Sequence, residues 1–286
     1  MPQIGKMINS ICICGAGTMG SGIAQTTAQH GFHTILFDIN EEVIAKAKTK
    51  IDSDLRILVE KKRLTPVEME KVKSHINFTK DLNNCIADLV IEAVIEKAEM
   101  KIALFNQLSE INHSETIFAT NTSSLSVKSI AEKVMRPERV AGLHFFNPAP
   151  VVKLVEVIRT DLTRADIIEA LINFSKQLGK TAVVCKDSPG FIVNRVARPY
   201  YLEALKLVEL GVSDPETIDR MMEATGFKMG PFKLMDLIGN DINLAVSNSV
   251  YEQLNKPERL KPSPVQKDKV EKGELGRKTK KGYYEY

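Results

Sequence analysis

The sequence predicts an α/β protein: a Rossmann-type, mostly parallel sheet domain with a helical-hairpin insertion, followed by a smaller all-helical domain. Three observations support this. An apolar run ends at a glycine-rich turn, short strands then alternate with helices as far as residue 185, and strand patterns stop after it. Because single cores stop growing near ~250 to 300 residues, a 286-residue chain favours two unequal domains. We place them at 1–186 and 187–286.

The first elements form a strand, helix, strand unit, at residues 7–14, 23–30 and 33–38. Gly31 ends the helix, and Asn40 caps the next one, which carries acidic residues in its first turn. This charged helical stretch runs over residues 41–63, is interrupted at Thr65-Pro66 and resumes through Lys73. We expect it to be a helical hairpin inserted in the sheet domain.

The alternation continues through the rest of the first domain. Strands are predicted at 76–78, 87–94, 116–121, 139–146, 153–159 and 181–185, with helices at 97–111, 126–134 and 164–178. After residue 187, helical spacing covers 191–210, 215–223 and 241–254, and the Pro- and Lys-rich segment 256–264 resembles a linker. Its composition predicts no regular structure there.

Composition excludes some function classes. The net charge of +3 comes from 39 basic and 36 acidic residues. The protein therefore has no strong overall positive potential of the kind that attracts nucleic acid or an anionic membrane. No apolar segment approaches the ~18 residues of a membrane span, and a strand-like run by Ile8 leaves no room for a signal or transit peptide. The four cysteines lack C-x-x-C spacing, so we predict no metal site; Cys12 and Cys14 should share one strand face as reduced core thiols. We expect a cytoplasmic protein.

The glycine-rich turn matches G-x-G-x-x-G, a dinucleotide-binding pattern, through Gly15, Ala16, Gly17, Thr18, Met19 and Gly20. Its glycines permit a tight turn and close approach of a pyrophosphate to the helix N-terminus. Asp38 ends the second strand at the offset expected of a ribose-binding carboxylate, which would repel a 2′-phosphate and so favours NAD over NADP. Taken alone, Asp38 would also suit an ordinary surface turn.

His144 and Glu156 are the candidate proton-transfer pair. His144 ends a predicted strand, at the sheet edge where open α/β sheets bind ligands. Glu156 lies in an apolar segment, where a buried carboxylate needs a partner. We expect Glu156 to be buried, within hydrogen-bond reach of His144, and to face the cleft between the domains. The alternative interpretation is that His144 is a structural histidine and Glu156 a solvated glutamate at the edge of the sheet.

Two further polar groups are ambiguous on their own. The Asn121-Thr122-Ser123-Ser124 segment follows a strand and precedes a short helix, where hydroxyl groups commonly serve as N-caps. Asn194 and Arg195 occur early in the first helix of the second domain, where polar side chains are usually solvated.

Several segments together resemble the L-3-hydroxyacyl-CoA dehydrogenase family. They are GAGTMGSGIAQ (15–25), NTSSLS (121–126), GLHFFNPAPVVKLVEVI (142–158), DSPGFIVNRVARP (187–199) and MGPFKLMDLIG (229–239). They follow the family's order over almost the whole chain. Among its members the chain is most similar to the free-standing bacterial 3-hydroxybutyryl-CoA dehydrogenases.

The resemblance implies roles for the catalytic candidates. His144 would be general base in oxidation and general acid in reduction, with Glu156 orienting it, while Ser123 and Asn194 would hydrogen-bond the substrate oxygen or the imidazole. Such positioned proton transfer accelerates reactions by roughly 10² to 10⁴. The hydride chemistry would belong to the NAD cofactor.

The resemblance also implies cofactor and substrate contacts. Glu96 and Lys101 would lie by the nicotinamide ribose with Asn147 near the same end, and Lys278 in the tail is a weaker cofactor-side candidate. The hairpin would meet the CoA nucleotide, with Lys61 as a phosphate contact. Asp54 departs from relatives that use serine there, and a solvated helix face is the alternative for each basic residue of the hairpin.

The predicted function is therefore NAD-dependent interconversion of L-3-hydroxyacyl-CoA, favouring four-carbon acyl groups, and 3-ketoacyl-CoA. A related dehydrogenase of a free hydroxy acid or sugar acid is the alternative, and an inactive NAD-binding relative is a third reading. The apolar residues between Leu202 and Leu210, together with the resemblance, predict a homodimer through the helical domain.

Overall fold

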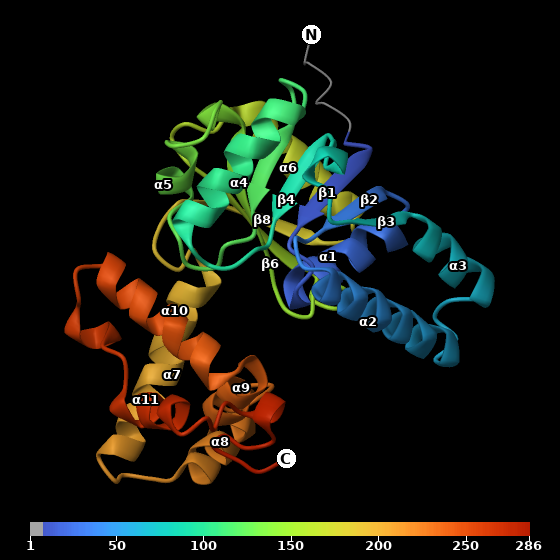
Figure 1. Cartoon of the computed structure of the whole chain (residues 1–286). Helices are drawn as coiled ribbons and strands as arrows, with labels where there is room; N and C mark the ends of the chain where they lie inside the picture. Colours follow the sequence, from blue (N-terminus) through green and yellow to red (C-terminus); the bar gives the residue numbers. More distant parts are fainter. Residues whose placement is uncertain (1–7) are drawn as a thin grey trace. The chain divides into compact units, whose positions relative to one another are not determined.

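A computed structural model describes residues 8–286; Met7, where the first strand was expected to begin, lies outside the described residues. The chain divides into two compact units between Asp187 and Ser188 (Figure 1). Strands alternate with helices in the first unit, and the named helices α7 to α11 make up the second.

In the described part of the first unit, eight strands form one sheet in the order β3-β2-β1-β4-β5-β6-β7-β8. Neighbouring strands are parallel except β6 and β7, which are antiparallel. The strand order changes direction between β1 and β4, which makes the carboxyl ends of these strands the expected ligand edge of such a sheet. The strands are β1 (Ser10–Cys14), β2 (His33–Phe37), β3 (Ile76–Thr79), β4 (Leu89–Glu92), β5 (Ile117–Thr120), β6 (Val140–Phe145), β7 (Leu154–Arg159) and β8 (Thr181–Lys186).

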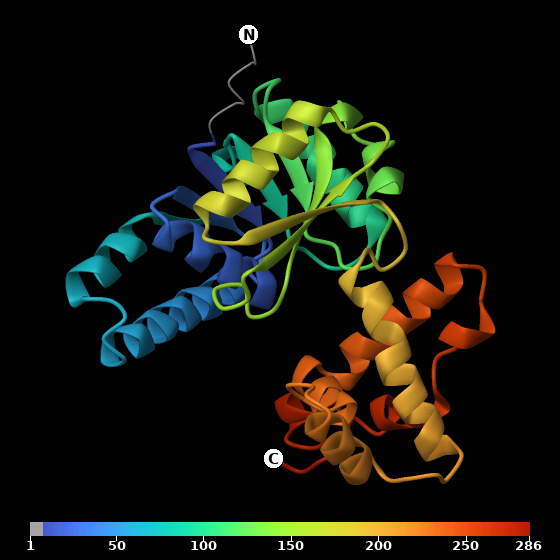
Figure 2. The ribbon, with the colours of Figure 1, turned by 180° about the vertical axis from the view of Figure 1, so that it is seen from behind.

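Helices cover both faces of the sheet (Figures 1 and 2). Ile11 and Ile13 of β1 pack in the core beneath α1, whereas Cys12 and Cys14 pack in the core beneath α4. The predicted placement of the two cysteines on one face is confirmed, with their Sγ atoms 3.8 Å apart. One face carries α1 (Thr18–Gln29), α2 (Glu41–Glu60), α3 (Pro66–Ser74) and α6 (Ala165–Gln177), and the other α4 (Ala98–Ile111) and α5 (Val127–Ala131).

The predicted start of the first helix at Ile23 was wrong, since α1 begins at Thr18. The glycine turn runs directly into the helix, and the N–H of Ser21 already donates to the carbonyl of Gly17 at 2.9 Å. Thr18, Met19 and Gly20 are therefore the first turn of α1. The inserted hairpin is present as α2 and α3, and α3 starts with a capping box between Thr65 and Glu68.

The second unit is helical, but two of its helices were not predicted. Segment 256–264 was expected to be a linker, yet the 3₁₀ turn Glu258–Leu260 leads into α11, and Leu260 is 1% exposed. Ser263 caps α11 and Pro264 occupies its first position, which proline suits. The helices are α7 (Val193–Glu209), α8 (Pro215–Ala224), α9 (Pro231–Ile238), α10 (Asn240–Gln253) and α11 (Pro264–Glu271).

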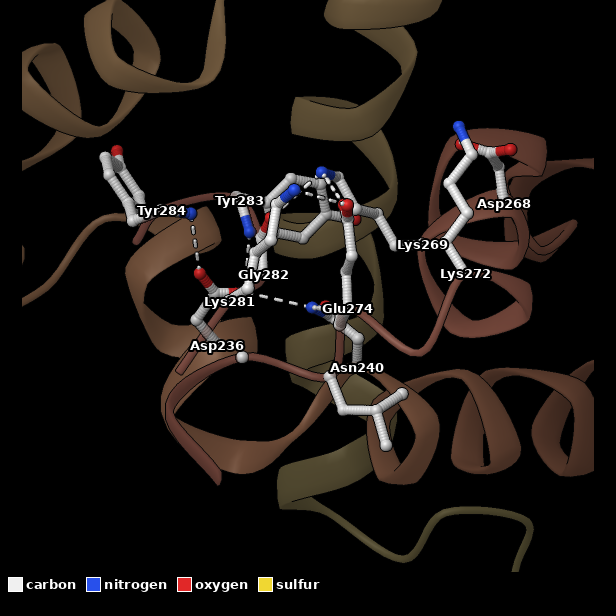
Figure 3. Close-up of polar contacts among 12 residues, drawn as sticks. Asp236, Asn240, Asp268, Lys269, Lys272, Glu274, Lys281, Gly282, Tyr283 and Tyr284 are labelled. Carbon is white, nitrogen blue, oxygen red and sulfur yellow. Dashed lines mark hydrogen bonds and ion pairs between the residues drawn. The ribbon is translucent and has the colours of Figure 1, made fainter. Parts of the chain in front are cut away.

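The C-terminal tail folds back on α9 (Figure 3). The carboxylate of Asp236, which is 1% exposed, accepts from the backbone N–H groups of Tyr283 and Tyr284, both at 3.0 Å. Glu274 forms ion pairs with Lys269 at 2.5 Å and Lys281 at 3.0 Å. The tail is thus an integral part of the helical unit.

The apolar residues expected to be spare for subunit contact are partly used inside this unit. Leu202 and Leu205 of α7 belong to its core, whereas Leu210, just after α7, is 64% exposed. Within residues 8–286, the structure contains no helix with the length and apolar character needed to cross a membrane.

Candidate active site

The glycine turn between β1 and α1 is shaped by close backbone contacts. Gly15 has φ +103°, and a Cβ there would lie 2.5 Å from the carbonyl oxygen of Ala93. A Cβ on Gly20 would lie 1.7 Å from the carbonyl oxygen of Gly15, but one on Gly17 meets nothing within 4 Å. The fold therefore requires glycine at 15 and 20, while Gly17 borders open space that a ligand can approach.

Asp38 is hydrogen-bonded to this turn. It follows β2, and its Oδ2 accepts from the N–H of Ala16 at 2.8 Å while Oδ1 accepts from the N–H of Asn40 at 2.9 Å. Among the described residues, no side chain caps the N-terminus of α1, so its first N–H groups can serve an anion. Open space at Gly17, an uncapped helix start and a carboxylate fixed beside them fit a dinucleotide.

The predicted contact between His144 and Glu156 is confirmed. The two residues are cross-strand partners in the antiparallel pair β6 and β7, and His144 Nδ1 lies 2.8 Å from Glu156 Oε2. Glu156 is 1% exposed and His144 5%, so the solvated-edge alternative for Glu156 is wrong. Because a carboxylate accepts, Nδ1 carries the proton in this contact, and Nε2 is the nitrogen suited to exchange a proton with a ligand.

The segment after β5 is organised around Glu96, and residues 121–124 do not provide the N-cap of α5. Glu96 Oε1 accepts from Thr122 Oγ1 at 2.5 Å, Ser123 N at 3.1 Å and Ser124 Oγ at 3.2 Å. The cap of α5 is Ser126 instead. Glu96 therefore fixes the backbone of Ser123.

Asn121 ties this segment to the catalytic strand. Its Oδ1 accepts from the N–H of Phe145 at 2.8 Å, the residue after His144. The ends of β5 and β6 are thereby held together, and the segment that carries Ser123 is anchored beside the strand that carries His144.

Lys101 lies behind Glu96 in a buried ion-pair chain. Its Nζ is 3.0 Å from Glu96 Oε2 and 2.6 Å from Glu92 Oε1, and both Lys101 (1%) and Glu92 (0%) are inaccessible. Burial raises the pKa of Glu92, although Lys101 opposes the shift. Burial also acts to raise the pKa of Glu96, but Lys101 and the donors from Thr122 and Ser123 outweigh it and hold that pKa below its usual value.

Sequence reasoning missed Glu92. It ends the apolar strand β4, where nothing but its charge distinguishes it from its neighbours. A carboxylate in a run that composition predicts to be buried was the available signal, and the same signal identified Glu156.

The other candidates are two residues of the first unit and two of the second. Asn147 is exposed, two residues beyond β6, and Lys61 is the exposed C-cap of α2. Asn194 is in the first turn of α7. Lys278 Nζ lies 2.6 Å from both carboxylate oxygens of Asp241.

Seven basic residues of the α2–α3 hairpin that were candidates for contact with CoA are exposed, and some have acidic partners. Lys50 pairs with Asp54, the residue that departs from the family pattern, and Arg56 pairs with Asp52 at 2.6 Å. Ion pairs within the described chain do not include Lys61, Lys62 or Arg63. These seven candidates are Lys46, Lys48, Lys50, Arg56, Lys61, Lys62 and Arg63.

A separate hollow lies where β7 and β8 end, lined by Ser126, Lys128, Arg159, Lys186 and Asp187 among others. Because β7 is antiparallel to β6, this is the sheet edge opposite the end of β6. None of the predicted site residues lines this hollow.

Both units of the chain match models of known protein families. Residues 10–188 match the family model "3-hydroxyacyl-CoA dehydrogenase, NAD binding domain", and residues 190–286 match "3-hydroxyacyl-CoA dehydrogenase, C-terminal domain". A 3-hydroxyadipyl-CoA dehydrogenase of Escherichia coli is 44% identical over 98% of this chain, which spans only 59% of that relative's length. A probable 3-hydroxybutyryl-CoA dehydrogenase of Deinococcus radiodurans is 40% identical, covering 96% of this chain and 99% of the relative.

Among solved structures, an (S)-3-hydroxybutyryl-CoA dehydrogenase from Ralstonia eutropha is similar. It superposes with a TM-score of 0.92 at 37% identity, covering 98% of this chain and 99% of that one.

Proposed function

Because the chain belongs to the 3-hydroxyacyl-CoA dehydrogenase family, we propose that it interconverts an L-3-hydroxyacyl-CoA and the corresponding 3-ketoacyl-CoA with NAD. The observation that carries the proposal is the buried contact of 2.8 Å between His144 Nδ1 and Glu156 Oε2. It orients the imidazole so that Nε2 can exchange a proton with a hydroxyl or carbonyl oxygen.

In oxidation, His144 Nε2 accepts the proton of the substrate 3-hydroxyl, and Glu156 stabilises the imidazolium that forms. In reduction the same nitrogen returns the proton. Ser123 and Asn194 hydrogen-bond the substrate oxygen or the imidazole. NAD supplies hydride transfer when bound.

For the cofactor, we propose that the turn from Gly15 to Gly20 holds the pyrophosphate and Asp38 the adenosine ribose. The fixed carboxylate of Asp38 favours NAD because it would repel the 2′-phosphate of NADP. Glu96, Lys101 and Asn147 serve the nicotinamide end, and Lys278 is a further cofactor-side candidate.

For the substrate, we propose an acyl-CoA whose nucleotide meets the α2–α3 hairpin, with Lys61 as a phosphate contact. Exposed basic residues without acidic partners at its tip support this assignment. A four-carbon acyl group is the favoured substrate, since the Deinococcus and Ralstonia relatives carry hydroxybutyryl-CoA in their names.

A related hydroxy-acid or sugar-acid dehydrogenase that does not use CoA is the alternative. The two are separated by measuring NADH consumption at 340 nm with acetoacetyl-CoA and with free acetoacetate. We expect rapid consumption only with the CoA ester, inhibited competitively by free CoA. Equal rates with both, and no inhibition by CoA, would instead support the alternative.

We further propose a cytoplasmic homodimer that acts in fatty acid or butanoate metabolism and binds neither nucleic acid nor membrane. Exposed apolar side chains of the helical unit support association, among them Val196, Leu210, Val212 and Met221, each more than 60% exposed. Light scattering should give twice the chain's mass of 31.9 kDa; a single-chain mass would overturn the dimer.

A further inference from the structure

Glu92 is not one of the proposed catalytic or cofactor-binding residues, yet it occupies the ligand edge of the sheet. It is the last residue of β4, next to the point where the strand order changes direction, and its side chain is 0% exposed. A carboxylate at such a position has lost its hydration, so its surroundings must supply every hydrogen bond.

The surroundings fix Glu92 with three donors. Oε1 accepts from Lys101 Nζ at 2.6 Å and from the N–H of Val94 at 2.7 Å, while Oε2 accepts from Thr120 Oγ1 at 2.8 Å. The three donors come from α4, the segment after β4 and the end of β5. Glu92 therefore has one orientation and determines where the ammonium group of Lys101 lies.

Lys101 transmits this position to the residues that face the ligand. Its Nζ also pairs with Glu96 Oε2 at 3.0 Å, and the other oxygen of Glu96 accepts from the N–H of Ser123 at 3.1 Å. The contacts run without interruption from Glu92 through Lys101 and Glu96 to the backbone of Ser123.

The buried ion pair of Glu92 and Lys101 is not explained by a contribution to folding stability. Removing both charges from water carries a large free-energy penalty, and replacing a buried ion pair by apolar residues of similar size is often neutral. The raised pKa of Glu92 has the same physical cause, which is desolvation of the carboxylate.

We propose that Glu92 is a positioning residue of the active site, acting through Lys101 and Glu96 to hold the Ser123 segment in its reactive geometry. The inference rests on the proposed function. Because displacement of a reacting group by about 1 Å can cost about 10²-fold in rate, loss of the anchor should lower kcat rather than only weaken substrate binding.

The test begins with Glu92→Gln, which keeps the side chain's shape but removes its charge. We expect kcat for acetoacetyl-CoA reduction to fall about 10- to 100-fold, with a smaller change in KM for acetoacetyl-CoA. The matched control is Asp88→Asn at the opposite end of β4, where the carboxylate accepts from the N–H groups of Asn9 and Ser10 at 3.0 and 3.1 Å. Asp88→Asn should leave kcat within about twofold of wild type.

A double-mutant cycle with Ser123→Ala identifies the route. If Glu92 acts through Ser123, adding Glu92→Gln to Ser123→Ala should lower kcat less than twofold, whereas a merely structural effect would lower it by the same factor in both backgrounds. If Glu92→Gln fails to fold, the double variant Glu92→Leu with Lys101→Met takes its place in the cycle. This double variant leaves no buried charge of the pair without its partner.

Unchanged kcat in Glu92→Gln, or equal effects in both backgrounds, would overturn the inference while leaving the proposed function intact. Failure of the wild-type protein to consume NADH with acetoacetyl-CoA would instead overturn the proposed function, and the inference with it.

Discussion

At the scale of single residues, the site depends on carboxylates held in fixed positions by neighbouring groups. Glu156 is 1% exposed and contacts His144, and Asp38 is fixed by two backbone N–H groups of the glycine turn and the segment after β2. A buried carboxylate beside an imidazole can stabilise the charge that develops on proton uptake. The contact of Glu156 leads to a prediction about the chemical step, and the glycine turn leads to a prediction about cofactor binding.

Glu156→Gln should lower kcat for acetoacetyl-CoA reduction by about 10²-fold, the lower range for a positioned proton-transfer group. The amide can still accept from Nδ1–H, so orientation is partly kept while the negative charge is lost. Steady-state kinetics gives kcat, and fluorescence titration should give an unchanged Kd for NADH. A variant with wild-type kcat would show that Glu156 has no part in catalysis.

Gly17→Ala and Gly20→Ala should separate cofactor binding from folding. A Cβ on Gly17 enters open space, so this variant should unfold at the wild-type temperature but bind NADH at least about tenfold more weakly, having lost close backbone approach. A Cβ on Gly20 lies 1.7 Å from the oxygen of Gly15, and overpacking of this kind typically costs 1 to 3 kcal/mol, occasionally more. Calorimetry and NADH titration measure both effects. Unaltered NADH affinity in Gly17→Ala would contradict the assignment.

At the scale of elements, the antiparallel pairing of β6 and β7 creates the catalytic contact. Residues directly opposite in an antiparallel pair lie with their Cα atoms only ~4.5 to 5.5 Å apart, and the register sets His144 against Glu156. A slip by one residue would point Glu156 to the other face of the sheet. In the helical unit, the C-terminal tail is held by the ion pairs of Glu274 with Lys269 and Lys281.

The ion pairs of Glu274 predict a pH dependence of stability. Lys269 and Lys281 lower the pKa of Glu274 to about 2, below the ordinary value of about 4.3 for glutamate. A depressed carboxyl pKa stabilises the fold above the unfolded-state pKa, and this contribution is lost as the pH falls through the folded-state pKa.

Glu274→Gln should therefore lower the unfolding temperature at pH 6, and its difference from wild type should shrink between about pH 4 and pH 2. Differential scanning fluorimetry across this pH range measures the difference in unfolding temperature. Glu271→Gln is the matched control, since Glu271 is 65% exposed and its ion pair with Lys267 is long, at 3.7 Å. A pH-independent difference would contradict the role of the two ion pairs.

At the scale of the whole molecule, the chain combines a nucleotide-binding sheet unit with a helical unit. The C-terminal tail packs against the core of this helical unit. A ligand that binds only the folded state stabilises the protein in proportion to the logarithm of its concentration. The glycine turn and Asp38 both belong to the first unit, so cofactor binding should be visible in the unfolding of the protein.

NADH at about 100 times its Kd should stabilise the folded protein by about 2.7 kcal/mol, whereas NADPH at the same concentration should stabilise it far less because of Asp38. Thermal unfolding with each nucleotide provides the measurement. Equal shifts with NADH and NADPH would contradict the role given to Asp38, and Asp38→Ala should reduce the difference between them.

The sequence predicted most of the sheet unit because its strands are short apolar runs separated by turn residues. It missed α9 and α11, which begin at Pro231 and Pro264, because proline there resembled a linker or turn and the tertiary contacts of Leu260 were not visible. It also missed Glu92 and the role of Glu96, since both depend on contacts between segments far apart in the chain.

The most direct test of the account is the reduction of acetoacetyl-CoA by preformed protein–NADH complex in a stopped-flow instrument, comparing wild type with His144→Gln. His113→Gln, which changes an exposed histidine outside the proposed active site, is the control. We predict that His144→Gln binds NADH with wild-type affinity but transfers hydride about 10²- to 10⁴-fold more slowly, while His113→Gln behaves as wild type. Hydride transfer by His144→Gln at the wild-type rate would contradict the account.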